Sequence, residues 1–412
     1  MAKIYPFQPY RYTDAAGPLG ALVTQPYDKI TPDMRARYLS QSPYNLVRII
    51  LGERFEADTE KDNVYTRAAR HFEEWRASGI LAKEDRPSLY AYFQEFCVPD
   101  TGERLTRKGF IGLGAVEDYE QGVVHRHEQT LSGPKKDRME LLRHTRAHCG
   151  QIFMLYPDAA GEIDRVLDEA AAAAPGAEVT DEYQTVHRLW KISEPGRIAA
   201  IQRLMADKKL LIADGHHRYE TALAFRNANP SLDDARRVMM TFVNMHSSGL
   251  KILATHRLVG NIAGFDAQQF IHAAGLRPAG GVAELRRLWE EPHAGRVRIG
   301  VAIAGLEPLY LYEAERGAGA LDVAVLHEKL LGGALGIGED AVRDEKHTRY
   351  MRGIEPAIAE VRSGAAQLAF LLEAVSVEEV ARIAFGGGVM PQKSTDFYPK
   401  LLSGLTIYRL ER

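Results

Sequence analysis

The residues with the clearest chemical potential form one short segment, Ala213-Asp214-Gly215-His216-His217-Arg218-Tyr219-Glu220. An apolar run, 210–213, precedes it, and apolar side chains resume at helical spacing after it. This order predicts a strand, a tight turn at Gly215 and a helix. The first N–H groups of a helix attract anions, and an arginine adds a donor fork suited to phosphate. We therefore predict a nucleotide-phosphate site at Gly215, His216, His217 and Arg218.

The same segment also fits a simpler interpretation. Asp214 could cap an ordinary helix, with His216 and His217 as surface residues. A single strand–glycine–helix junction leaves both interpretations open. The grouping of several functional side chains around one glycine favours the phosphate site.

A second segment, residues 125–142, places a carboxylate among basic groups. Glu128 follows His127, and Lys135, Lys136 and Arg138 come after a Gly-Pro pair. A carboxylate in such a setting can act as a general base that activates a hydroxyl toward a polyphosphate. The alternative is a solvated loop of mixed charge. We also expect Asp137 to cap the helix that follows.

A third segment, residues 385–405, combines glycines at 386–388 with Lys393, Ser394 and Thr395. One ammonium and two hydroxyls in a row suit a carboxylate or phosphate ligand. The alternative is a capped turn between a helix and the terminal strand.

Other motifs carry less weight. The glycines of 332–338 indicate a helix end, and no Walker A sequence is present. His125, His127, His216 and His217 could hold zinc, but their spacing matches no standard site. Trp75 and Trp190 are expected in the core.

These segments need a framework of alternating strands and helices. Helices are predicted at 32–41, with Thr31 as its cap, at 58–78, ending at Gly79, and around the alanine run 170–174. The alternation predicts mixed α/β (α+β) layers, with domains at 1–120, 121–262 and 263–412. Strands are predicted at 88–98, 109–116, 151–156, 209–213, 238–243, 297–302 and 367–372.

Composition excludes several classes of protein. The chain has 412 residues, 45% of them hydrophobic, and a net charge of −3. A nucleic-acid partner would favour a basic excess, so none is expected. No apolar run approaches the ~18 residues of a membrane span, and residues 1–12 have no apolar h-region, so neither a membrane span nor a secretory signal is expected. Because Cys97 and Cys149 make no disulfide framework, we expect a cytoplasmic protein.

Along nearly its whole length the sequence resembles the bacterial family DUF1015. The strings that carry this resemblance are QPYDKIT (25–31), HEQT with PKKDR (127–138), ADGHHRYETAL (213–223), HRLV (256–259) and MPQKSTDFYPKLLSGL (390–405). The family name states no activity.

The ADGHHR string also resembles the nucleotide-binding turn of the ParB/sulfiredoxin superfamily, and within it the archaeal free serine kinases. The order of motifs is similar: His127-Glu128-Gln129, then Asp214 to Arg218, then 393–395. The resemblance implies a ParB/sulfiredoxin-like nucleotide-binding core with additional N- and C-terminal α/β domains. Two departures are a longer stretch between the first two motifs and residues 1–120, which have no counterpart.

Carried over residue by residue, this resemblance implies a kinase that phosphorylates free L-serine with Mg²⁺ and ATP or ADP. Glu128 would be the catalytic base, and Asp214 would orient the hydroxyl or reach the metal. Lys393, Ser394, Thr395 and His127 would surround the amino acid. The alternatives are a ParB-like nucleotide-dependent switch and a metal-dependent hydrolase. The metal ligands, the phosphate donor and the oligomeric state stay open.

Overall fold

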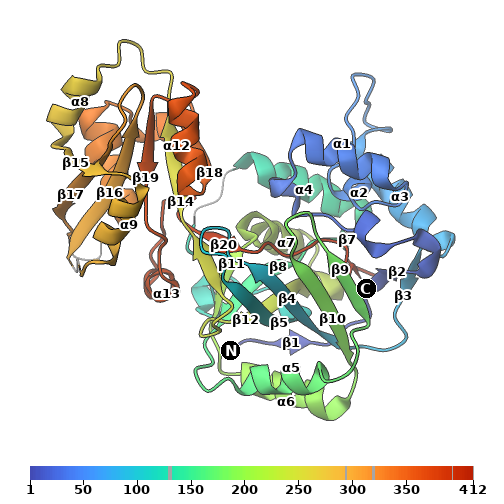
Figure 1. Cartoon of the computed structure of the whole chain (residues 1–412). Helices are drawn as coiled ribbons and strands as arrows, with labels where there is room; N and C mark the ends of the chain where they lie inside the picture. Colours follow the sequence, from blue (N-terminus) through green and yellow to red (C-terminus); the bar gives the residue numbers. More distant parts are fainter. Residues whose placement is uncertain (129–131, 293–294, 318–320, 392, 412) are drawn as a thin grey trace. The chain divides into compact units, whose positions relative to one another are not determined.

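The computed structural model describes residues 1–128, 132–292, 295–317, 321–391 and 393–411. The chain has a mixed α+β fold (Figure 1) and forms two compact units. The first comprises residues 1–251, 381–389 and 399–412, and the second comprises 252–380 and 390–398. Among the described residues, no helix combines the length and the apolar character needed to cross a membrane.

A nine-stranded sheet forms the centre of the first unit. Its strands are β1 (Ile4–Tyr5), β4 (Leu89–Cys97), β5 (Arg104–Ala115), β6 (Val124–His125), β8 (Ile152–Tyr156), β9 (Ala177–Thr180), β10 (Val186–Ile192), β11 (Leu210–Asp214) and β12 (Arg237–Asn244). The order is β6-β11-β8-β12-β5-β4-β10-β9, with β1 on β5. β6 and β11 are parallel, so their carboxyl ends meet at the same edge.

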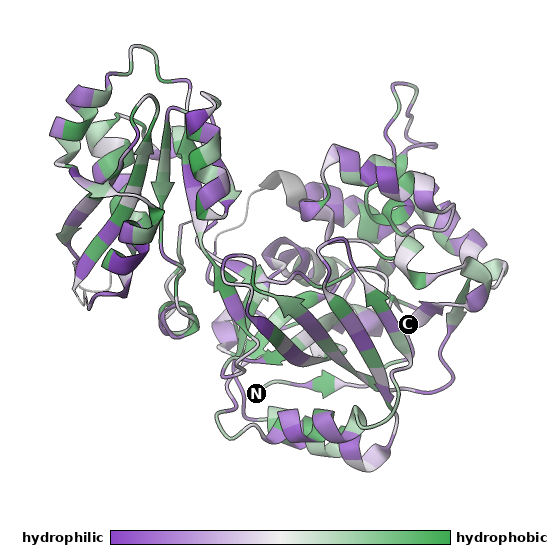
Figure 2. Cartoon of the chain, viewed as in Figure 1, coloured by the Kyte–Doolittle hydropathy of each residue, from purple (hydrophilic) through white to green (hydrophobic). Residues whose placement is uncertain are grey.

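Two helices, α5 (Glu162–Ala170) and α6 (Pro195–Met205), cover one face of this sheet (Figure 1). Hydrophobic side chains of the strands point toward them, and Figure 2 shows the corresponding hydrophobic bands along the sheet. Ile163 and Leu167 of α5 and Ile201 of α6 are fully buried in this core. The removal of this apolar face from water stabilises the sheet whose strand ends carry the polar motifs.

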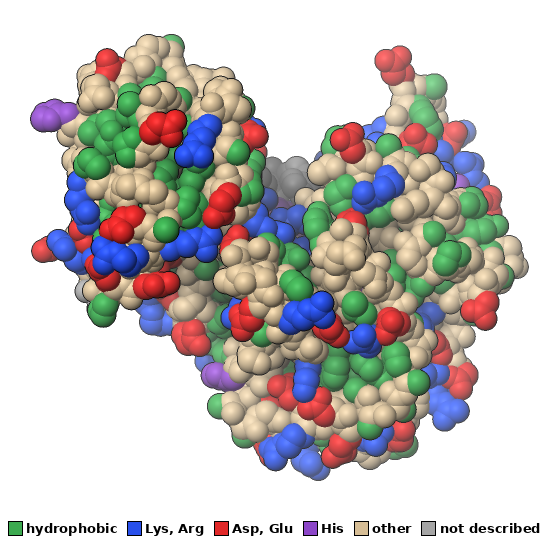
Figure 3. Space-filling model, viewed as in Figure 1, with side chains coloured by type: hydrophobic (Ala, Val, Ile, Leu, Met, Phe, Trp, Pro, Cys, Tyr) green, Lys and Arg blue, Asp and Glu red, His purple; other side chains and the backbone are tan. Residues whose placement is uncertain are grey.

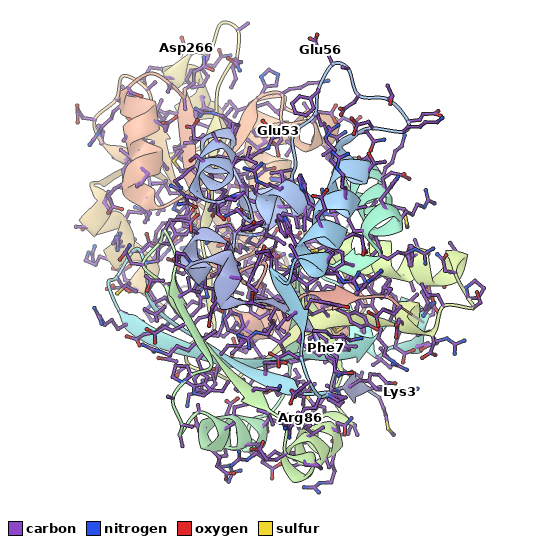
Figure 4. The ribbon with its side chains drawn as sticks, turned by 90° about the vertical axis from the view of Figure 1, so that its right-hand side faces the viewer. Lys3, Phe7, Glu53, Glu56, Arg86 and Asp266 are labelled. Carbon is purple, nitrogen blue, oxygen red and sulfur yellow. The ribbon has the colours of Figure 1, made fainter. Side chains whose placement is uncertain are left out.

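A second core lies among helices α2 (Val47–Ile50), α3 (Val64–Ala77) and α4 (Ser132–Thr145) of the same unit. α1 (Pro32–Gln41) precedes these helices in the chain. Phe72 and Trp75 of α3 pack there with Leu141 of α4. The small sheets β2 (Tyr10–Tyr12) with β3 (Leu81–Lys83) and β7 (Ala147–His148) with β21 (Tyr408–Arg409) border it. Figure 4 shows Glu53 near these helices and Glu56 at the outer end of the loop between α2 and α3.

The second unit is a six-stranded antiparallel sheet with helices on both faces. Its strands are β14 (Thr255–Val259), β15 (Arg277–Gly280), β16 (Arg296–Ile303), β17 (Leu309–Glu315), β18 (Thr348–Arg352) and β19 (Leu368–Leu371), in the order β15-β17-β16-β19-β14-β18. α9 (Val282–Glu290) and α12 (Ile354–Arg362) bury apolar side chains on one face. On the other, Phe270 of α8 (Ala267–Ala274) contacts Phe370.

Several shorter elements complete the second unit. α10 (Asp322–Val325) continues directly into a π-helix, η6 (Leu326–Ala334). α11 (Glu339–Arg343) follows, and β13 (Lys251–Leu253) pairs with β20 (Asp396–Tyr398). α13 (Val377–Phe385) begins in the second unit and ends in the first.

Most predicted elements are confirmed. α1 begins after Thr31, whose side chain accepts from the Met34 N–H at 3.3 Å. The predicted strands correspond to β4, β5, β8, β11, β12, β16 and β19, and both Trp75 and Trp190 are buried. Cys97 and Cys149 are free thiols.

Three details differ from the prediction. α3 begins at Val64 rather than near 58, because Asn63 and Thr66 form a capping box there. α5 ends at Ala170 because the alanines beyond it bury little surface and Pro175 disfavours continuation. Asp137 lies inside α4 and is not a cap: it accepts from Arg54 and Tyr65 and so joins α4 to α3.

The compact units also differ from the three predicted domains. β4 and β5, from residues 1–120, lie in the same sheet as β8, β11 and β12, so no unit boundary falls near 120. Sequence-distant strands pair here through backbone hydrogen bonds, which composition does not reveal. The change of unit at 251–252 lies near the predicted break at 262.

The two-unit division predicts that core damage stays local. Leu285 of α9 is fully buried against β16, and Leu285→Ala should destabilise the second unit by roughly 2–5 kcal/mol. Hydrogen–deuterium exchange should then accelerate in β16 and β19 while β8 and β11 stay protected. Met154→Ala, in the core of the first unit, is the matched control and should give the reverse pattern. Uniform acceleration with either variant would contradict independent units.

Candidate functional site

The strand–glycine–helix junction has the predicted geometry. β11 ends at Asp214, and Gly215 adopts a left-handed backbone with φ of 95°. α7 (His216–Ala228) begins at the next residue, and its first intrahelical bond runs from the Tyr219 N–H to the Gly215 carbonyl. The N–H groups of 216–218 therefore precede the hydrogen-bonded part of the helix and point out of its positive end.

Arg218 folds back over the glycine. Its Nη2 donates to Asp214 Oδ2 at 2.7 Å, and its Nη1 donates to the Gln151 carbonyl. A Cβ at position 215 would lie 3.0 Å from the Arg218 guanidinium nitrogens. Glycine is thus favoured at position 215 by its backbone conformation and by this close approach. The guanidinium joins α7 to β11 and to the segment just before β8.

Cations surround the Asp214 carboxylate. Lys400 Nζ lies 3.4 Å from Asp214 Oδ1, opposite the bond to Arg218. Burial alone would raise the pKa of Asp214, but the charges of Lys400, Arg218 and Lys29 hold this pKa well below its usual range. The carboxylate is therefore ionised throughout the neutral range, and the turn has more positive than negative charge in its immediate surroundings.

Two histidines form the buried side of the turn. His127 is fully buried, and its Nδ1 donates to the Ile212 carbonyl of β11 at 2.8 Å. His216 meets it edge-on, with ring centroids 4.7 Å apart. Burial lowers the pKa of His127 to about 4 and that of His216 well below its usual value. Both rings are neutral near pH 7, and His216 Nε2 has no hydrogen-bond partner among the described residues.

Glu128 lies at the same edge of the sheet, three residues after the end of β6. β6 ends at His125 beside Leu211 of the parallel strand β11, so residues 126–128 run alongside the Asp214 turn. Glu128 is half-buried there. Gln129, the last residue of this motif, lies outside the described residues.

A third carboxylate, Glu220, neutralises cations at the rim. Arg126 Nη1 lies 3.3 Å from Glu220 Oε1, and Lys135 of α4 contacts its other oxygen. His217 is half-exposed on the first turn of α7. The structure therefore gathers Glu128, His127, Asp214, Gly215, His216, His217 and Arg218 at one end of β6 and β11.

A small pocket opens beside Arg218. It has a volume of about 60 Å³ and includes a second guanidinium, that of Arg138, which stacks on the Tyr27 ring at 4.1 Å. Burial raises the pKa of Tyr27, so its hydroxyl keeps its proton. The remaining wall includes apolar side chains from several elements, among them Leu141 and Leu142 of α4 and Ile152 of β8. The arrangement suits a partly apolar group attached to an anion.

Sequence reasoning missed Lys400 and the residues that support it. Arg107 is fully buried; it donates from Nε to Gln94 Oε1 at 3.0 Å and from Nη2 to the Pro399 carbonyl. Gln94 Nε2 donates to the Lys400 carbonyl at 2.8 Å. These bonds fix the backbone from which the Lys400 side chain reaches Asp214. β5 carries basic residues at 104, 107 and 108 before its apolar half, so the sequence did not single out Arg107 as the buried one.

Of the third predicted segment, the glycines at 386–388 belong to the first unit, whereas residues 393–395, called here the acceptor loop, belong to the second. Lys393 adopts a left-handed backbone with φ of 57°, and Arg257 Nη2 donates to its carbonyl at 3.0 Å. Ser394 is buried and donates to the Pro391 carbonyl, and Thr395 follows it into β20. Gly215 to Arg218 belong to the first unit.

Of the four histidines considered for zinc, His127 and His216 lie against each other, whereas His125 has other partners. His125 binds backbone carbonyls of Gly122 and Ala384, while His127 binds that of Ile212. Across the described residues, no group of three or more histidines, cysteines and carboxylates is arranged to hold a metal ion.

On the face of the first unit seen in Figure 3, acidic and basic side chains are interspersed.

The chain belongs to the family described as protein of unknown function DUF1015, whose model matches residues 4–319. No curated protein matches it.

Solved structures show only distant similarity. A conserved hypothetical protein from Pyrococcus furiosus is 15% identical with a TM-score of 0.35, over 69% of this chain and 92% of that one. A free serine kinase in complex with AMP is 13% identical with a TM-score of 0.38, over 69% and 89%. SbnI from Staphylococcus aureus, with a C-terminal truncation, is 9% identical with a TM-score of 0.35, over 72% and 87%. Similarities this weak carry no argument.

The close approach of Arg218 to Gly215 gives a direct stability test. Gly79 has a comparable φ of 76°, but a Cβ added there would meet no atom within 4 Å, so Gly79→Ala should cost only backbone strain, roughly 1–2 kcal/mol. Gly215→Ala should cost more, because Arg218 must also move away from Asp214. Urea denaturation of both variants measures the difference. Equal losses would show that the guanidinium does not depend on the glycine.

Proposed function

We propose that the protein is a small-molecule kinase that transfers a phosphoryl group from a nucleotide, ATP or ADP, to the hydroxyl of free L-serine, giving O-phosphoserine. The protein would act in the cytoplasm on small molecules, with no nucleic-acid or membrane partner. Phosphoryl transfer needs positioning and charge neutralisation more than covalent chemistry from the protein. The turn after β11 has the groups for both tasks.

One observation carries the proposal: the open N-terminus of α7 lies next to Arg218 and Lys400, with Arg126, Lys135 and Arg138 around it. Backbone N–H groups and guanidinium or ammonium groups at one turn are what a polyphosphate requires. Arg218 makes two hydrogen bonds, and only one of them is to Asp214. A phosphate would compete with Asp214 for Arg218. The small, partly apolar pocket beside Arg218 would take an apolar part of the nucleotide.

Glu128 is proposed as the general base. It is a half-buried carboxylate at the sheet edge that carries the turn, where it could accept the proton of an attacking hydroxyl. Lys393, Ser394 and Thr395 remain the proposed contacts of the amino acid. The resemblance also implies His127 as one of these contacts, but its burial and its bond to Ile212 favour support of the turn instead.

The carboxylates present fit a Mg²⁺ ion in their chemistry. Mg²⁺ in such enzymes takes one or two carboxylates together with substrate phosphates. Asp214, which stays ionised, and Glu128 at the neighbouring strand end would be these donors once a phosphate takes over the contact of Arg218 with Asp214. The ion would neutralise charge on the phosphates, while the residues of the chain bind and orient both substrates.

Arg218 should matter for nucleotide affinity. Arg218→Ala is expected to weaken binding of ADP or ATP by about 1.5–3 kcal/mol, the value of a charge-assisted hydrogen bond. Calorimetry with Mg²⁺ measures this. Arg226→Ala on the same helix, whose partner is Asp118, is the matched control and should bind normally. Unchanged affinity in a folded Arg218→Ala variant would remove Arg218 from the site.

Glu128 should matter for turnover. Glu128→Gln keeps the size of the side chain but cannot accept a proton, so turnover should fall roughly 10²- to 10⁴-fold with nucleotide affinity nearly unchanged. Phosphorus NMR of protein with nucleotide, Mg²⁺ and a set of hydroxy amino acids follows the product. Glu120→Gln, an exposed carboxylate in the same region of sequence, is the control. Near-normal turnover in Glu128→Gln would leave Asp214 as the leading base.

A further inference from the structure

The second unit contains a polar pocket of about 170 Å³. This is more than ten times the roughly 10–15 Å³ that one water molecule needs. Its wall comes from β14, α10, the segment between β19 and α13, and Ser394. Its charged side chains belong to two arginines and three carboxylates, Arg257, Arg316, Asp322, Glu373 and Glu379.

Arg257 supplies a buried cation to this pocket. Only 2% of the residue is exposed, and its guanidinium donates to the carbonyls of Thr255 and Lys393. Burial, reinforced by the charge of Arg257, lowers the pKa of both His256 and His327 to about 4. Both imidazole rings are therefore neutral near pH 7, and the guanidinium of Arg257 is the positively charged group beside them.

The backbone at the pocket is strained where Arg257 holds it. Lys393 is one of few non-glycine residues with positive φ, and the guanidinium bond to its carbonyl fixes that conformation. Strain of this kind persists only where surrounding contacts enforce it, and it concentrates at ligand clamps. The π-helix η6, which carries His327, directly continues α10 of the pocket wall, and π-helical turns are also frequent at functional sites.

The charges of both signs select the type of ligand. Arg316 contacts Asp322 and lies 3.7 Å from Glu379, so cation and carboxylates share one wall. A simple anion would face three carboxylates, and a simple cation would face two guanidiniums. A small molecule with one carboxylate and one ammonium can pair with both, which offsets the cost of removing charges from water.

We propose that this pocket binds a free α-amino acid as its zwitterion, with the carboxylate toward Arg257 and the ammonium toward Asp322 and Glu379. The identity of this amino acid as L-serine, the phosphoryl acceptor, rests on the proposed function. The binding of an amino acid as such rests on the charges of the pocket and is independent of that function. Ser394 lines the pocket, so the proposal joins the acceptor loop to side chains on β14, α10 and α13.

Calorimetry on the full chain, without nucleotide, tests the pocket. L-Serine should bind, whereas L-lactate, which lacks the ammonium, and ethanolamine, which lacks the carboxylate, should each bind at least tenfold more weakly. Glu379→Gln should weaken L-serine binding at least tenfold and leave nucleotide affinity unchanged. Glu378→Gln, at the exposed neighbouring position outside the pocket wall, is the matched control and should bind L-serine normally.

Equal binding of L-serine and L-lactate, or equal affinities in the Glu379→Gln and Glu378→Gln variants, would overturn the proposal, as would no binding of L-serine at millimolar concentration. The phosphoryl-transfer assay separates it from the proposed function. If serine is phosphorylated with an apparent KM that Glu379→Gln does not alter, the proposed kinase activity stands and the proposed amino-acid pocket is wrong. If L-serine binding depends on Glu379 but no phosphoryl transfer occurs, the pocket stands and the kinase activity is wrong.

Discussion

The bridge that Arg218 makes over Gly215 is the interaction on which the candidate site depends. One guanidinium holds the carboxylate at the end of β11, the carbonyl before β8 and the first turn of α7 in a single arrangement. A glycine avoids a tight contact with the guanidinium and adopts this backbone conformation without strain. In the proposed function a phosphate would take the place of Asp214 at Arg218, so the contact that stabilises the turn would also be the contact that binds the ligand.

A network of buried polar groups holds Lys400 beside Asp214, the carboxylate that Arg218 also binds. Arg107 and Gln94 hold the backbone at 399–400, and the Tyr92 hydroxyl accepts from the Leu402 N–H at 3.3 Å. Burial lowers the pKa of Arg107 to about 9, which records the cost of keeping this guanidinium out of water. Such a cost is acceptable where the buried group fixes a unique arrangement, and here it fixes Lys400 beside Asp214. The C-terminal segment is thus part of the turn's electrostatic environment.

The sequence predicted what depends on neighbours along the chain. The strand, the left-handed glycine and the start of α7 follow from local signals at 210–220, as does the Thr31 cap of α1. Lys400 was missed because it lies almost two hundred residues from Asp214, and its role comes from the bonds of β4 and β5 to its backbone. Asp137 was misplaced for a related reason: its partners Arg54 and Tyr65 come from another part of the chain. Local pattern reveals turns and caps, but not the pairing of distant charges.

The two units concentrate different kinds of charge, and this difference limits what each can bind. At the turn after β11 the carboxylates are outnumbered by cations, and helix N–H groups add further positive potential, so the favoured ligand is an anion. In the pocket of the second unit, arginines and carboxylates alternate, so an anion and a cation are each disfavoured. A protein with only the first site would suit a binding or hydrolytic role. The proposed site for a dipolar molecule would provide for a second substrate, and the two sites together would then suit transfer between two substrates.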